Sequence, residues 1–145
     1  MRIPIRLRRL RLADYEAVVE LFQLVGMEPR VKGRDSRAAI GSQLRSKANV
    51  FLGAFDGKRL VGTVFGTHDT RKGWINRLAV HPVYRRRGVA RRLVRAAERG
   101  LRARGVRMFA ALIEPGNSAS EAVFLGLGYK IDTMVYARRK LHPDI

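Results

Sequence analysis

The fold of this chain is decided by the stretch from Trp74 to Gly105, which reads WINRLAVHPVYRRRGVARRLVRAAERGLRARG. Its first part, Trp74 to Pro82, has the pattern of a β-strand that is closed by a proline-containing turn. Its last part is typical of an amphipathic helix, with one apolar stripe formed by Val89, Leu93, Ala96, Ala97 and Leu101. The segment RRRGVA, Arg85 to Ala90, therefore lies where the strand gives way to the helix.

This junction predicts a phosphate-binding site. The backbone amides of residues 86–91 have no partner at a helix start, and the positive end of the helix dipole favours an anion there. Gly88 has no Cβ and Ala90 has a small side chain, so both allow a phosphate to approach the backbone closely. A single glycine near a helix start is weak support by itself, because most helix starts bind no ligand.

Length and composition limit the class of protein. With 145 residues, the chain predicts one domain, residues 1–145, around a single core. It has no cysteine and only three histidines, so we expect no metal site. It contains no run of 18 apolar residues, which predicts a soluble, cytoplasmic protein without a membrane span.

The net charge is +18, and arginine supplies 24 of the 30 basic residues. The segment Arg85 to Arg107 holds ten arginines and a single acid, Glu98. Four of these arginines follow one another at helical spacing, namely Arg91, Arg95, Arg99 and Arg102. This stripe indicates either a solvated basic surface or a polyanionic partner, such as RNA or an acidic protein. Single-strand RNA sites also need aromatic residues for stacking, and none lies between Tyr84 and Phe109.

Alternation, helical periodicity and turn residues predict one continuous unit without repeats. The first half is expected to contain a strand through Ile3, Ile5 and Leu7, a helix from Tyr15 to Val25 capped by Asp14, a helix capped by Ser36 that ends near Lys47, and antiparallel strands Val50–Phe55 and Leu60–Thr67 around a tight turn at Asp56-Gly57. The second half is expected to contain the strand Trp74–Val80, the arginine-rich helix, a parallel strand Arg107–Ile113, a helix Ser118–Leu127 that stops at Gly128, and one or two strands within Tyr129–Leu141.

The order of these pieces resembles the GNAT superfamily of N-acetyltransferases. That family has a strand, then a Q/R-x-x-G-x-G/A loop, then a helix, and the loop is matched here by Arg85, Gly88 and Ala90. The segment NSASEAVFLGLGY, Asn117 to Tyr129, resembles the family's later helix and its LGF-like end. The resemblance covers residues 74–129. It implies an α+β, three-layer fold with a mixed central sheet of six or seven strands and helices on both faces.

In that family, acetyl-CoA lies in a V-shaped gap between strands four and five. The resemblance implies that the backbone of strand four pairs with the pantetheine arm and that the loop holds the pyrophosphate. Carried over to this sequence, the cofactor-binding residues are Leu78, Ala79, Val80, Arg85, Arg86, Arg87, Gly88, Val89, Ala90, Arg91, Asn117 and Phe124. The amide of Val80 matches the family's oxyanion donor. Asn117 also has an ordinary structural explanation, as the N-cap of the helix that follows it.

Two positions depart from the family's pattern. Many relatives place a carboxylate on strand four as the base, where this chain has Asn76, and a tyrosine in the last helix as the acid, where it has Phe124. Three interpretations remain: Glu114 replaces the base, the acceptor amine has a low pKa and needs little help, or the protein binds acetyl-CoA with little catalysis. His68 and His81 are better explained as a loop residue and a turn residue.

The leading hypothesis is an enzyme that transfers acetyl from acetyl-CoA to a primary amine, either a protein or peptide N-terminus or a small amine. The alternative is a basic, RNA- or ribosome-associated acyl-CoA-binding protein. The sequence leaves open whether the chain forms a homodimer.

Overall fold

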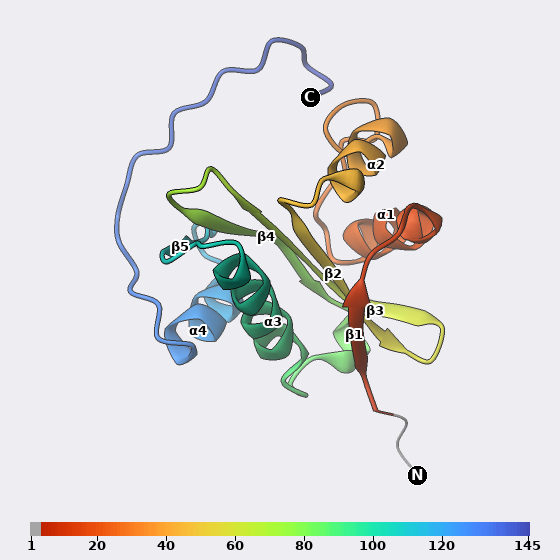
Figure 1. The fold of residues 1–145 in the computed structure, drawn as a ribbon, viewed down its shortest axis with the longest axis horizontal. Helices are drawn as coiled ribbons and strands as arrows, with labels where there is room; N and C mark the ends of the chain where they lie inside the picture. Colours follow the sequence, from red (N-terminus) through yellow and green to blue (C-terminus); the bar gives the residue numbers. More distant parts are fainter. Residues whose placement is uncertain (1–3) are drawn as a thin grey trace.

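The computed structural model describes residues 4–145, and its centre is a five-stranded sheet in the order β1-β2-β3-β4-β5 (Figure 1). The first four strands are antiparallel neighbours, and β5 runs parallel to β4. The strands are β1 (Arg6–Arg9), β2 (Val50–Asp56), β3 (Arg59–His68), β4 (Gly73–Val80) and β5 (Phe109–Ala110). The helices are α1 (Tyr15–Leu24), α2 (Arg37–Arg45), α3 (Val89–Ala103) and α4 (Ser118–Gly126), with short 3-10 turns at Leu12–Asp14 and Pro82–Tyr84.

The sheet separates two apolar clusters. On one face, α3 and α4 pack against the sheet, and the stripe of α3 buries Val89, Leu93, Ala97 and Leu101 as expected. On the other face, α1 and α2 cover a cluster in which the rings of Phe51 and Phe65 stack at 4.0 Å. Alternate residues of a strand point to opposite faces, so β2 contributes Val50 and Ala54 to the first cluster and Phe51 to the second. The expected three-layer arrangement is confirmed.

Local signals in the sequence set several element ends. Ser36 caps α2, because its Oγ accepts the amide of Ala39 at 3.1 Å. Gly57 has a φ of +59° in the turn between β2 and β3, and Gly128, with a φ of +91°, follows α4. Asp14 differs from the expected helix cap. It makes no capping bond to α1 and instead accepts the amide of Arg11 and pairs with Arg8 at 2.8 Å.

The expectation of six or seven strands is wrong, since the sheet formed by residues 4–145 has five. β5 is limited to two residues where Arg107–Ile113 was expected, and Tyr129–Leu141 contains no strand. This last segment runs as an extended trace around the outside of the molecule (Figure 1). Its alternating pattern gives it strand propensity, but a strand also needs a neighbour with which to exchange hydrogen bonds. Ile3 of the expected first strand lies outside the described residues.

Candidate functional site

Strands β4 and β5 are paired only at one end. The parallel register joins Gly73 to Phe109 and Trp74 to Ala110, and pairing stops there while β4 continues to Val80. The amide of His81 donates to the carbonyl of Val61 on β3 at 2.8 Å. Because alternate residues of a strand direct their amides to opposite sides, the amide of Val80 faces away from β3, toward the side of β5. Beyond Trp74, this edge of β4 therefore has no strand partner within residues 4–145.

A β-bulge interrupts β4 at the middle of this free edge. The register between β3 and β4 shifts between Thr63 and Phe65, and Arg77 has a φ of +52°, in the left-handed region. The fully buried hydroxyl of Thr63 donates to the carbonyl of Arg77 at 2.8 Å. This bond supplies a partner for a carbonyl that the bulge removes from the regular ladder.

The segment that joins β4 to α3 presents a series of unpaired amides. Arg86 has a φ of +63°, and Gly88, the N-cap of α3, has a φ of +75° and provides no capping side chain. In the described part of the chain, the amides of residues 86–88 donate no hydrogen bond. The amides of the first turn of α3 have no preceding helical carbonyl to which they could donate. A Cβ built on Gly88 would meet no atom within 4 Å, so the space above this loop is open. Such an arrangement fits the oxygens of a phosphate.

The arginines of this loop have different surroundings. Arg85 donates through Nε to the carbonyl of Val80 at 3.3 Å, which links the loop to the end of β4. Arg87 lies over the ring of Tyr84 at 5.1 Å. Arg91 donates to the carbonyl of Gly126 at 3.3 Å and so connects α3 with α4. All of these arginines are exposed, as is Arg86, so their charge is available to an anion at the loop.

Two side-chain hydrogen bonds hold the 3-10 turn that precedes the loop in place. The hydroxyl of Tyr84 hydrogen-bonds to the carboxylate of Asp56, and Nδ1 of His81 accepts the amide of Val83 at 3.2 Å. Partial burial, together with the charges of Arg59 and Arg85, lowers the pKa of His81, which favours the neutral ring. His81 therefore has a structural role in this turn, as its sequence position suggests.

The residues considered for proton transfer lie in contrasting positions. Asn76 is half-buried on β4 opposite Phe65. Glu114 is exposed, four residues beyond the end of β5, and its side chain has no hydrogen-bond partner in the described residues. Phe124 is only 3% exposed and meets the ring of Tyr129 edge-on at 4.9 Å.

The remaining expected contacts are backbone or capping positions. Asn117 is the N-cap of α4, because its Oδ1 accepts the amide of Ser120 at 3.1 Å. Ala79 is buried against the α1 side of the sheet, so its side chain belongs to the core. Leu78 and Val80 pack partly against the opposite cluster, and Val89 lies in it. The buried side chains of Ala79 and Val89 are therefore not available to a ligand, whereas those of Leu78 and Val80 are partly exposed.

An ion pair that no sequence motif marks lies next to this site. Arg77, at the bulge, donates to the buried carboxylate of Asp35 at 2.5 Å and to the carbonyl of Met27 at 3.4 Å. The same carboxylate accepts the amide of Arg30 at 2.8 Å. These contacts attach the loop between α1 and α2 to β4. The sequence signal is faint: an isolated acid in a basic loop, far along the chain from its partner.

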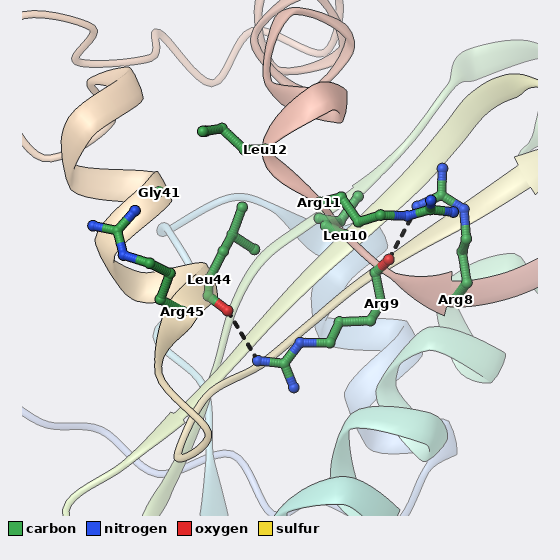
Figure 2. A pocket seen from close by; sticks show the side chains of 8 residues that line it. All are labelled: Arg8, Arg9, Leu10, Arg11, Leu12, Gly41, Leu44 and Arg45. Atoms are coloured by element: carbon green, nitrogen blue, oxygen red, sulfur yellow. Dashed lines mark hydrogen bonds between the residues drawn. The ribbon is translucent and has the colours of Figure 1, made fainter.

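A second basic feature lies at the opposite edge of the sheet. A hollow of about 730 Å³ between β1 and α2 is lined by Arg8, Arg9, Leu10, Arg11, Leu12, Gly41, Leu44 and Arg45 (Figure 2). Arg9 donates to the carbonyls of Leu44 and Ser46, and Arg8 pairs with Asp14. Two of the four arginines that line the hollow thus connect β1 with α2 and with the turn before α1. These contacts stabilise the fold.

Metal and membrane sites receive no support. Residues 4–145 contain no group of three or more potential ligands that could hold a metal ion. Within the same range, no helix has the length and apolar character that crossing a membrane requires.

Comparison with known proteins adds family and fold. An acetyltransferase of Pectobacterium atrosepticum is 29% identical over 139 residues, which cover 95% of this chain and 96% of that protein. The PaiA N-acetyltransferase of Thermoplasma acidophilum, solved in complex with coenzyme A, superposes with a TM-score of 0.80 at 20% identity, over 91% of this chain and 93% of that one. The aminoglycoside acetyltransferase AAC(6')-Iy, solved with a CoA-containing bisubstrate analogue, has a TM-score of 0.79 at 21% identity, over 94% and 99%.

The two solved structures therefore share the fold of this chain. The family model described as "Acetyltransferase (GNAT) family" matches residues 14–129, which include α1, the bulged strand β4, the loop 85–91 and α4. The chain belongs to the acetyltransferase (GNAT) family.

Proposed function

We propose that this chain, as a single domain, transfers an acetyl group from acetyl-CoA to a primary amine. The observation that carries the proposal is the row of unpaired amides from residue 86 to the first turn of α3, next to the free edge of β4. The diphosphate of coenzyme A matches the amides in charge and geometry. The pantetheine arm contains amides that can pair with the free edge of β4, and two solved relatives of the same fold were crystallised with coenzyme A or a CoA-containing analogue.

In the reaction, the nitrogen of the acceptor attacks the thioester carbonyl and forms a tetrahedral intermediate. The C–S bond then breaks, the acetyl group stays on the amine, and coenzyme A leaves as a thiolate that takes up a proton. We assign the oxyanion of the intermediate to the amide of Val80, which faces away from β3. Removing one such donor typically costs about 3–4 kcal/mol of barrier stabilisation.

The proton of the amine needs an acceptor. Asn76 cannot accept it at neutral pH, and Phe124 has no hydroxyl to protonate the thiolate. Glu114 follows β5, whose pairing with β4 ends at Trp74 and Ala110, and its carboxylate has no hydrogen-bond or ion-pair partner within residues 4–145. We assign the base to Glu114 for acceptors with an ordinary amine pKa. An α-amine with a pKa near about 7.7–8.0 needs much less help than a lysine near about 10.4.

The acceptor is proposed from charge. With a net charge of +18, the chain repels polyamines and attracts acidic acceptors. A peptide or protein N-terminus with acidic residues nearby, or a small amine without additional positive charge, fits this surface. Aminoglycosides, the substrates named for the relative AAC(6')-Iy, are polycationic and fit it less well.

A second candidate function is binding of a polyanion such as RNA, with acyl-CoA binding but little catalysis. The exposed arginines Arg91, Arg95, Arg99 and Arg102 on α3 favour it. The candidates differ in turnover: the enzyme releases coenzyme A only when an acceptor amine is present, whereas the binder releases none.

The test is release of the coenzyme A thiol from acetyl-CoA across a panel of amines and peptides. The chain has no cysteine, so a thiol reagent reports coenzyme A alone. We expect turnover with acidic or neutral peptides that have a free N-terminus and none with the same peptides acetylated at that terminus. If the protein binds coenzyme A but acetylates no acceptor in the panel, the second candidate function is favoured.

A further inference from the structure

The hollow between β1 and α2 lies away from the proposed acetyl-transfer site. β1 forms one edge of the sheet, whereas β4, with its free edge, lies three strands further along. The volume of the hollow, about 730 Å³, is within the range of small-molecule sites. We call it the β1–α2 hollow, and the acetyl transfer proposed above makes no use of it.

The floor of the β1–α2 hollow is apolar. Leu10 is 4% exposed, Leu44 is half-buried, and Leu12 is 37% exposed. Gly41 lies in the middle of α2, where glycine is less favourable than alanine. A Cβ at Gly41 would lie 3.3 Å from Cδ1 of Leu12, so the glycine keeps space open at the floor. This surface suits an aliphatic chain.

Every charged residue that lines the hollow is an arginine, and two of the four are already engaged. Arg8 donates to both carboxylate oxygens of Asp14, at 2.8 and 3.0 Å. Arg9 donates to two carbonyls at the end of α2, at 3.2 and 3.0 Å. Arg11 and Arg45 are exposed, and their side chains donate no hydrogen bond within residues 4–145. Two guanidinium groups are therefore available to a ligand.

These two groups come from opposite walls of the hollow. Arg11 follows β1, and Arg45 is the last residue of α2 (Figure 2). Of the described residues, none that lines the hollow is acidic. The planar fork of a guanidinium matches the oxygens of a carboxylate or a phosphate. The charge therefore favours a ligand with an oxyanion, whereas the floor favours a ligand with an apolar chain.

The edge of β1 is closed to an added strand. The amide of Leu10 donates to β2 at 2.9 Å, so the carbonyl of Arg9, one residue earlier, faces away from β2. That carbonyl accepts a hydrogen bond from Arg8 at 3.0 Å, and the carbonyl of Ile5 accepts one from Arg92 at 2.9 Å. An extended peptide would find both main-chain acceptors occupied. A small ligand held by side chains fits this place better.

We propose that the β1–α2 hollow binds a small amphipathic anion, with an aliphatic chain on the leucine floor and a carboxylate or phosphate head held by Arg11 and Arg45. Burial of the chain supplies the attraction, and the two guanidinium groups select the sign of the charge. Neither part of the ligand binds well alone, because an exposed ion pair contributes little and a chain without a charged head leaves both arginines unpaired.

The first test is titration of isotope-labelled protein with octanoate and with octyl phosphate, followed by NMR. We expect at least one of the two probes to cause saturable shifts of the amides of Leu12, Gly41 and Leu44. Octanol lacks the charge and acetate lacks the chain, and each should bind about tenfold more weakly, or less well still. No saturation by either probe, or shifts confined to residues 78–91, would overturn the proposal.

The second test separates this site from the general attraction of a chain with a net charge of +18. Arg11→Gln combined with Arg45→Gln is expected to weaken binding of the tighter probe about tenfold. The matched control combines Arg71→Gln with Arg107→Gln, two exposed arginines that do not line the hollow, and should bind as wild type. Equal affinities of the two double variants would show that overall charge explains the binding, and the proposal would be wrong.

The third test fills the floor. Gly41→Leu places a large side chain in the hollow and a better helix former in α2, and it should weaken binding of the probe about tenfold. Ser42→Leu adds the same side chain at the next, exposed position of α2 and should bind as wild type. Circular dichroism confirms that each variant is folded. A folded Gly41→Leu with wild-type affinity would contradict the proposed floor.

A hexaglutamate peptide tests the class of ligand. It carries negative charge without an aliphatic chain, so we expect it to shift the amides of α2 only at concentrations above those of the tighter amphipathic probe. Tighter binding of hexaglutamate at the same amides would overturn the assignment to an amphipathic anion. None of these measurements involves acetyl-CoA, so their outcome is independent of the proposed acetyl transfer.

Discussion

The guanidinium of Arg77 and the carboxylate of Asp35 form an ion pair of 2.5 Å that joins β4 to the loop ahead of α2. Both side chains are largely buried, with 19% and 7% of their surface exposed. Arg77 is also the residue that adopts a positive φ in the β4 bulge. The pair therefore connects the strand that faces the candidate site with the α1–α2 loop.

Asp35→Asn is expected to lower the free energy of unfolding by about 2–4 kcal/mol, because it leaves the charge of Arg77 without its partner inside the protein. Urea unfolding followed by circular dichroism measures the loss. Glu16→Gln is the control, since Glu16 pairs with Arg37 at the surface and should cost less than about 1 kcal/mol. Equal losses in the two variants would show that the buried Arg77–Asp35 pair contributes no more to stability than the surface pair of Glu16 and Arg37.

Thr63→Val removes the hydroxyl that donates to the carbonyl of Arg77 while it keeps the shape of the side chain. We expect a loss of about 1–3 kcal/mol in stability, because a buried carbonyl loses its partner, and a lower kcat, because the bulge is less well fixed. Thr67→Val, near the end of β3, is the matched control: the hydroxyl of Thr67 makes no hydrogen bond in the described residues. An unchanged kcat in Thr63→Val would show that this hydrogen bond to the bulge has no effect on catalysis.

The contact between Arg8 and Asp14 predicts a pH dependence of stability. The hydrogen bond from Arg8 holds the pKa of Asp14 below its ordinary value, although desolvation opposes the shift. A lowered folded-state pKa stabilises the protein above the unfolded value of about 3.9, and this contribution is lost as the pH falls through the folded-state pKa. When the pH is lowered from about 5, the free energy of unfolding should therefore decrease less in Asp14→Asn than in wild type. Glu20→Gln, at an exposed position of α1, should follow wild type. Identical profiles for Asp14→Asn and wild type would contradict the assignment.

Glu114→Gln tests the proposed base. With a lysine-like acceptor, we expect kcat/KM to fall by about 10²- to 10⁴-fold. With an α-amine of low pKa, the loss should be smaller, because more of the amine is already neutral. Glu121→Gln, in the first turn of α4, is the control and should keep its activity. A loss below twofold for both acceptors would remove Glu114 from the mechanism.

The central part of the fold was predictable because its signals are local. The stripe of α3, the caps at Ser36 and Asn117, and the turn at Gly57 all depend on residues within one or two turns of each other, and each lies as expected. The positive φ of Gly88 at the start of α3 belongs to the same class, since only a residue without Cβ adopts it freely.

The predictions that were wrong or missing concern residues whose partners lie far along the chain. Residues 129–141 alternate like a strand, but the sequence does not say which edge they would join, and in this structure they join none. The Arg77–Asp35 pair crosses 42 positions without any motif to mark it. Asp14 satisfies the rule for a helix cap, yet the charge of Arg8 captures its carboxylate instead.

The amides between Arg86 and the first turn of α3 form the proposed binding site for coenzyme A. The most direct measurement is calorimetric titration of coenzyme A into wild type, Gly88→Glu and Gly105→Glu. Both glycines have positive φ and open space at Cβ, so the two variants carry the same backbone strain and the same added charge. We predict saturable binding by wild type and Gly105→Glu and at least tenfold weaker binding by Gly88→Glu, because only there does a carboxylate face the diphosphate. No heat of binding with folded wild type, or equal affinity in all three proteins, would contradict the account.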